Sequence, residues 1–289
     1  MEQSVLIEIG LPIALAIIMT GMGMTLVPSD FQRVVARPKA LIWGALAALL
    51  LLPALSIVLA MALRLPAEMA VGLLIIAACP IGTTSNLIAF LARGRLALSI
   101  ALTVVGSLAT IVTLPLFANF ALERFVHADA RVYLPVLRTV AMLLGIVLVP
   151  VLIGMLVRHK APALAARAER AVSLFGALVL LALIVGIGIS VADQWLRILA
   201  SAGPAVIALS VCGILLGFVG SRLLGIGAEE TITVVVGMSV RNAAIGMLIA
   251  IGMMNSPEMA VPAALYGLLM YAFGFALIGY GRMTIRAAA

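Results

Sequence analysis

Residues 79–86 read CPIGTTSN, and they interrupt an apolar run that extends from residue 67 to residue 92. Pro80 and Gly82 disfavour a continuous helix, and four polar side chains follow them directly. If the run crosses a membrane, its unpaired backbone groups cannot face lipid. The sequence therefore predicts a helix that is broken at this point, with the break buried in protein or lining a wet cavity.

A second apolar run is interrupted in the same way. Residues 236–246 read VGMSVRNAAIG, in which Gly237, Ser239, Arg241 and Asn242 take the place of apolar side chains. Two such breaks favour a shared cavity, because half-helix ends and freed carbonyl groups form the ion and substrate sites of many secondary transporters. The alternative is that glycine and serine merely let two spans pack closely against their neighbours.

The overall composition is typical of a protein that crosses a membrane many times. Of 289 residues, 65% are hydrophobic and 10% are charged, and the mean hydropathy is +1.31, which excludes a soluble domain. A span needs about 20 apolar residues, so we expect an all-α polytopic membrane protein with about nine transmembrane helices in one domain, residues 1–289. The expected spans are 5–26, 40–62, 67–92, 96–121, 133–156, 171–192, 198–221, 229–253 and 259–281.

The two breaks lie five spans apart in this scheme, so the broken segments are expected to run in opposite directions. Inverted-topology repeats require this relation. The sequence therefore predicts one repeat at about 5–121, a linking span at about 133–156 and a second repeat at about 171–281.

The positive charges predict an orientation in the membrane. Twelve of the eighteen Lys and Arg residues fall in alternate loops and the C-terminus, on one side of the predicted spans. The positive-inside rule places this side in the cytoplasm, with the N-terminus outside and the C-terminus inside the cytoplasmic (inner) membrane. The net charge of +7 does not indicate a nucleic-acid partner, because the arginines stand singly without interleaved aromatics. No protein partner is implied either.

Long stretches of the chain resemble bacterial members of the bile acid:sodium symporter family. They are GMGMTLVPSDF (21–31), LPAEMAVGLLIIAACPIGTTSNLIAFLARGRLALSIALT (65–103), VVVGMSVRNAAIG (234–246) and AVPAALYG (260–267). The resemblance implies inverted repeats that form a core domain, with two crossing broken helices, and a separate panel domain. Substrate would bind between the two domains. The resemblance also implies that the family's usual first helix has no counterpart here, so we expect nine spans rather than ten.

The resemblance also implies one sodium site. Its ligands map without a gap onto Ser85, Asn86, Ser99 and Thr103. Ser99 and Thr103 are four residues apart and so share a helix face, and hard oxygen ligands suit a hard cation. A sodium ion is the only cofactor-like group expected, and no organic cofactor is.

The family's second sodium site has no matching ligands in this chain. It uses a glutamate and a glutamine on the second broken helix. One register places Gly237 and Arg241 at these positions, and the other places Val235 and Ser239 there. A further glutamine of the family aligns with Ala48. Because neither register supplies a carboxylate, we expect this second site to be absent.

Arg241 is a charged residue expected deep inside a span, where a charge needs a partner or a wet cavity. One hypothesis is that its guanidinium replaces the second sodium ion, which would give a carrier or facilitator independent of sodium. Another is that Arg241 binds an anionic substrate through its planar donor fork. A third is that it lies near the end of the span and reaches water. Proton coupling is disfavoured, because the eleven acidic residues fall in loops or near span ends.

The substrate is expected to be a small organic anion, either bile-acid-like or pantoate-like. Thr83 and Asn242, beside the two breaks, are the other predicted contacts, because half-helix N-termini favour negative charge. Together these features indicate a secondary transporter that works by alternating access. An intramembrane enzyme is disfavoured because no nucleophile with a base and an orienting group is found. A channel and a non-transporting sensor stay open as alternatives.

Overall fold

The structure is a computed structural model that describes residues 10–25, 38–126, 135–190 and 195–285. Every regular element in these residues is a helix, which confirms the all-α prediction. The elements in chain order are α2 (Leu11–Thr25), α4 (Pro38–Leu46), η2 (Ala47–Leu51), α5 (Leu52–Ala62), α6 (Ala67–Ala78), α7 (Thr84–Leu91), α8 (Leu96–Phe125), α9 (Val136–Leu143), η3 (Leu144–Leu148), α10 (Val149–Lys160), α11 (Pro162–Ser190), α12 (Trp195–Leu223), α13 (Ala228–Ser239), α14 (Ala243–Met247), η5 (Leu248–Met253) and α15 (Pro257–Thr284).

Among the residues that the structure describes, five continuous helical stretches are long and apolar enough to cross a membrane. They cover Pro38–Ala62, Leu96–Phe125, Val136–Lys160, Ala202–Leu223 and Pro257–Thr284. Large apolar side chains point outward from the bundle: Leu137 is 83% exposed and Phe275 is 71% exposed. Such a surface suits lipid rather than water. The count of nine spans stays a prediction, since parts of the chain, including residues 1–9 at the start of the first expected span, lie outside the described residues.

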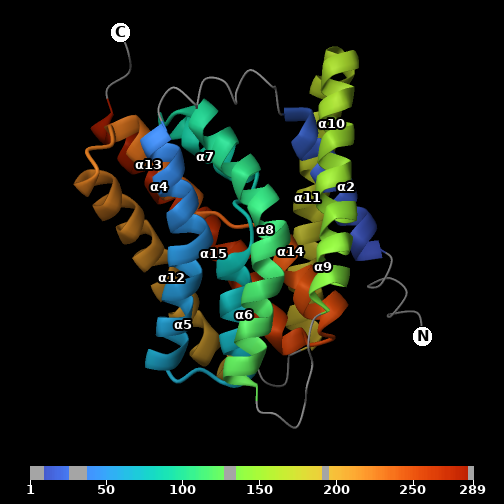
Figure 1. Cartoon of the computed structure of the whole chain (residues 1–289), viewed down its shortest axis with the longest axis vertical. Coiled ribbons are helices and arrows are strands. Elements are labelled where there is room, and N and C mark those ends of the chain that lie inside the picture. The colour runs from blue at the N-terminus through green and yellow to red at the C-terminus, as the bar shows by residue number, and fades with distance from the viewer. Residues whose placement is uncertain (1–9, 26–37, 127–134, 191–194, 286–289) are drawn as a thin grey trace.

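The helices fall into two groups that pack side by side. In Figure 1, α2, α9, α10 and α11 stand together on one side, and α2 packs on both α10 and α11. The other group holds α6 at its centre, in contact with α5, α8 and α15, while α12 packs on α13. The hydrophobic core runs through this second group, where every residue of α6 from Met69 to Ala78 is buried.

Close helix contacts in both groups depend on glycine. In α2, a Cβ atom at Gly23 would lie 2.1 Å from the Val151 carbonyl oxygen of α10. In α6, a Cβ atom at Gly72 would lie 2.2 Å from the Met259 carbonyl oxygen of α15. Only glycine lets the backbones approach this closely, which is the usual way that helices pack in membranes.

Both predicted breaks are present. Helix α6 ends at Ala78, and Cys79 takes an extended conformation, with ψ of 155°, because the following Pro80 disfavours the helical region. Helix α7 then begins at Thr84. Helix α13 ends at Ser239, Val240 is extended, and α14 begins at Ala243.

The two breaks meet and run antiparallel. Ile81 and Arg241 form an isolated antiparallel β-bridge. The Gly82 N–H donates to the Val240 carbonyl oxygen at 3.1 Å, and the Asn242 N–H donates to the Pro80 carbonyl oxygen at 2.9 Å. These bonds satisfy backbone groups that the helix breaks would leave unpaired. The two breaks therefore pair with each other directly and antiparallel, whereas the shared cavity and the inverted repeats stay predictions.

Candidate functional site

A cluster of side-chain oxygens lies where α7 meets α8. Asn86 is in the first turn of α7, and its Oδ1 accepts a hydrogen bond from the Ser99 hydroxyl at 2.8 Å and one from the Thr103 hydroxyl at 3.3 Å. Ser99 is 3% exposed and Thr103 is fully buried. The structure thus brings together three of the four residues predicted as sodium ligands.

Ser85 is the fourth predicted ligand and is also fully buried. Its Oγ has no hydrogen-bond partner among the described residues, although its backbone N–H donates to the Gly82 carbonyl oxygen at 3.0 Å. A buried hydroxyl without a partner is costly, since desolvation is not repaid by a hydrogen bond. Ser85 is the second residue of α7 and precedes Asn86, so its oxygen lies in the first turn of this half-helix without a partner among the described residues.

A tight turn fixes α7 and α8 relative to each other. Arg93 adopts a left-handed backbone conformation, with φ of 60°, and its Nη1 donates to the Ile285 carbonyl oxygen at 2.7 Å. The Arg95 N–H donates to the Thr233 hydroxyl of α13 at 2.8 Å, and its Nε bonds Glu229 at 3.1 Å. The turn is therefore bound to both α13 and the end of α15, which holds Asn86 opposite Ser99.

Arg241 is fully buried at the crossing and does not reach water. Its Nη1 donates to the Cys79 carbonyl oxygen at 3.0 Å, and its Nη2 donates to the Ala48 carbonyl oxygen at 3.1 Å. Its Nε has no partner among the described residues. The side chain thus bridges the end of α6 and the π-helical turn η2, and the hypothesis that it extends to water from the end of its span is wrong for this structure.

The Ala48 carbonyl is free to accept because of Pro53. In η2 the Leu52 N–H donates to the Ala47 carbonyl oxygen. The next donor along the chain would be the N–H of residue 53, and proline has none. The π-helical turn and Pro53 therefore leave the Ala48 carbonyl oxygen without an intrahelical partner, and Arg241 supplies one. Sequence reasoning missed this acceptor. Pro53, five residues after Ala48, could have indicated a carbonyl group without its helical donor.

Arg241 is neighboured by polar groups but by no carboxylate among the residues that the structure describes. The fully buried Tyr266 of α15 lies beside the guanidinium, and its hydroxyl donates to the Met238 carbonyl oxygen at 3.3 Å. Both salt bridges found in the described part of the chain belong to Arg95, with Glu229 and Glu230. Within the described residues, the guanidinium of Arg241 is thus paired with carbonyl dipoles.

The two remaining predicted contacts flank the crossing. Thr83 precedes α7 and is half-buried, and its carbonyl oxygen accepts from the Asn86 N–H at 3.1 Å. Asn242 is half-buried as well, and its Oδ1 accepts from the Ile245 N–H at 3.3 Å, which caps α14. Both residues therefore stand at the N-terminal ends of half-helices, where the dipole is positive.

The structure also indicates which of Gly237 and Val235 faces the crossing. A Cβ atom at Gly237 would lie 3.3 Å from Ile81 Cδ1, inside the first break. Val235, by contrast, packs against α12, where its Cγ2 would lie 3.1 Å from a Cβ atom at Gly217. Gly237 is therefore the position from which a longer side chain would point toward Ile81.

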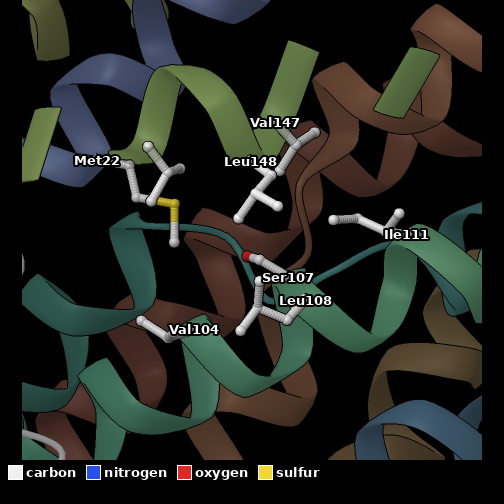
Figure 2. A pocket seen from close by; sticks show the side chains of 8 residues that line it. Met22, Val104, Ser107, Leu108, Ile111, Val147 and Leu148 are labelled. Carbon is white, nitrogen blue, oxygen red and sulfur yellow. The ribbon is translucent and has the colours of Figure 1, made fainter. Parts of the chain in front are cut away.

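A small pocket lies between the two groups of helices. Figure 2 shows its lining: Val104, Ser107, Leu108 and Ile111 of α8 face Met22 of α2, Val147 and Leu148 of η3, and Val151 of α10. Ser107 is the one polar side chain in this lining, and its hydroxyl donates to the Thr103 carbonyl oxygen at 2.8 Å. The pocket therefore lies one helical turn from the oxygen cluster. Its cavity volume is about 20 Å³, which is room for little more than one water molecule.

Comparisons with known proteins point to one family of transporters. The model of the family described as "Sodium Bile acid symporter family" matches residues 12–198. An uncharacterized sodium-dependent transporter, YocS of Bacillus subtilis, is 32% identical over 277 residues, which cover 95% of this chain and 83% of the relative. A probable sodium/metabolite cotransporter, chloroplastic BASS1 of Arabidopsis thaliana, is 28% identical over 94% of this chain and 66% of its own length. The human ileal sodium/bile acid cotransporter is 30% identical over 77% of this chain and 63% of its own length.

Proposed function

The chain belongs to the sodium bile acid symporter family, and from this premise we propose that it carries a small organic anion across the cytoplasmic membrane together with sodium. The observation that carries the proposal is the cluster of Asn86, Ser99 and Thr103, and the buried Ser85 that precedes Asn86 in α7 has a hydroxyl without a partner among the described residues. These four side chains offer neutral oxygens, which are the ligands that a hard cation prefers. Similar proteins are named as transporters or cotransporters, and the chain is not an enzyme.

Sodium binding requires only small changes in the cluster. The Ser99 hydroxyl donates to Asn86 Oδ1, and the Thr103 hydroxyl shares its one hydrogen between Asn86 Oδ1 at 3.3 Å and the Ser99 carbonyl oxygen at 2.9 Å. Each hydroxyl can turn its hydrogen away from an arriving ion. The oxygens would then face the ion while the helix backbones stay in place. Because α7 begins at the first break, an ion held here would also fix the geometry of the crossing.

The anion would bind between the two groups of helices, near the pocket and the crossing. In this proposal α2, α9, α10 and α11 form the panel domain, and the remaining helices form the core domain of two inverted repeats. Thr83 and Asn242 would contact the anionic group, and the apolar lining from Val104 to Val151 would contact the rest of the substrate. The pocket is too small for a steroid or for a small organic acid, so the helix groups would have to separate for either to enter, as alternating access requires.

Transport by reconstituted protein tests the proposal. Proteoliposomes are loaded with potassium and exposed to labelled taurocholate or labelled pantoate, in sodium or in choline. We expect saturable uptake of one of these anions that is at least about tenfold faster in inward sodium gradients, since coupling adds the ion's gradient to the driving force. Exchange of labelled for unlabelled substrate should accompany it.

Two other results would contradict the proposal in different ways. Flux that does not saturate and shows no exchange would indicate a channel. Binding of the anion without any exchange would indicate a sensor. Liposomes without protein serve as the background control.

A further inference from the structure

We infer that the guanidinium of Arg241 is a permanently tethered cation that fills a second ion position at the helix crossing, so that the carrier couples to a single sodium ion. This inference rests on the proposed function, because it concerns the number of ions that accompany the substrate. It depends on different residues, however. The oxygen cluster around Asn86 binds the mobile ion, and the crossing holds the fixed one.

The first argument is the chemistry of the groups that Arg241 contacts. Cys79 gives the terminal carbonyl of α6, and Ala48 gives the carbonyl that Pro53 and η2 leave free. Unwound carbonyls and half-helix C-terminal ends are the groups that coordinate cations in broken-helix transporters. Arg241 therefore places a positive charge where the backbone presents an array of negative dipole ends.

The second argument is the permanence of the charge. Arginine stays protonated in proteins, and its planar fork donates two well-directed hydrogen bonds here. The side chain is fully buried and has no carboxylate partner among the described residues. A second cation brought to the same carbonyls would meet a like charge at short range, and this repulsion excludes it.

The third argument is the local space. Gly237 lies close against Ile81, because a Cβ atom there would be only 3.3 Å from Ile81 Cδ1. No acidic side chain of α13 reaches the crossing, because Glu229 and Glu230 lie in its first turn. A crossing built to bind a mobile cation would gain from a carboxylate at this point. The crossing instead has Gly237 and Arg241. Arg241 supplies the positive charge, and Gly237 has no carboxylate. The guanidinium of Arg241 therefore binds backbone carbonyl groups rather than the substrate.

Counting bound sodium tests this inference. Purified protein is equilibrated with radioactive sodium-22 at saturating concentration, and we expect one ion per chain. Two ions per chain would overturn the tethered cation but leave sodium-coupled transport in place. No bound sodium would overturn the proposed function itself, so the two failures are distinguishable.

A double variant tests the role of Arg241 in that count. Gly237→Glu with Arg241→Gln removes the fixed charge and adds a carboxylate that points toward Ile81, so the count should rise from one to two. Arg222→Gln, at an exposed arginine in the last turn of α12, is the matched control and should stay at one. A double variant that folds and still binds one ion would overturn the inference.

A second measurement keeps the inference testable if the double variant does not fold. Arg241→Ala opens a space beside the Cys79 and Ala48 carbonyls, and we expect millimolar methylguanidinium to raise its melting temperature while leaving the parent unchanged. Ligand binding to the folded state alone produces such a shift. Equal melting curves with methylguanidinium and with choline would contradict a cation position at the crossing.

Discussion

Asn86→Ala is expected to lower the affinity for sodium by about 100-fold, which corresponds to about 2.7 kcal/mol. Asn86 Oδ1 is the point on which the Ser99 and Thr103 hydroxyls converge, so alanine removes a ligand and the acceptor that orients two others. Interactions of polar groups with a charge contribute about 1.5–3 kcal/mol each, in keeping with this size. Sodium-dependent uptake in proteoliposomes, measured against sodium concentration, gives the affinity.

A pair of threonine variants distinguishes the loss of a sodium ligand from the general effect of removing a buried threonine hydroxyl. Thr103→Val should weaken sodium dependence, whereas Thr139→Val should leave it unchanged. The two threonines are both fully buried, and each donates to the carbonyl oxygen four residues earlier, at 2.9 Å for Thr103 and 3.0 Å for Thr139. If both variants changed the sodium dependence equally, the oxygen cluster would not be the sodium site.

Gly72→Val is expected to lower the stability of the folded protein by about 3 kcal/mol or more. A Cβ atom at this position would lie 2.2 Å from the Met259 carbonyl oxygen and 2.9 Å from Pro262, so α6 and α15 would have to move apart. Because α6 carries the Cys79 carbonyl that binds Arg241, the separation would also disturb the crossing. Thermal unfolding in detergent, followed by loss of monodisperse protein, measures the effect.

The control for this variant is Gly279→Ala. It lies in α15, the helix that Gly72 contacts, but a Cβ atom there would meet nothing within 4 Å. We expect the melting temperature of Gly279→Ala to stay within a few degrees of the parent. If Gly72→Val melted at the same temperature as this control, the tight contact between α6 and α15 would not be present in the protein.

The sequence was sufficient to predict both helix breaks, whereas their crossing was expected only from the resemblance to the family. Pro80 and Gly82 exclude a continuous helix, and the residue before a proline takes an extended conformation, as Cys79 does. The polar residues that follow each break could not face lipid, so they had to face each other or a cavity. These are local rules, and they do not depend on the placement of distant helices.

The partners of Arg241 could not be predicted in the same way. The sequence indicated a buried charge in need of a partner, and alignment with the family pointed to Ala48, but as a lost glutamine side chain. The structure shows that the backbone carbonyl oxygen of Ala48 accepts a hydrogen bond from Arg241, because Pro53 leaves that oxygen without a helical donor. Which carbonyl meets a given side chain depends on how α4 to α5 pack beside α6, and that is a tertiary contact.

The pocket between the helix groups was also beyond sequence reasoning. Its residues come from four separate elements, and most are ordinary aliphatic side chains that would equally well lie in a core. Ser107 is the exception, at four residues after Thr103 and eight after Ser99, on the same face of α8. That spacing could have indicated that one helix face carries both the oxygen cluster and the edge of a cavity.

Thermal stability of the purified protein in sodium and in potassium, at constant ionic strength, tests the sodium site most directly. Binding to the folded state stabilises it by about 2.7 kcal/mol when the ion is present at 100 times its dissociation constant. We predict a melting temperature that rises with sodium concentration in the parent and does not rise in Asn86→Ala. Identical melting curves in sodium and potassium, up to high sodium, would contradict the account.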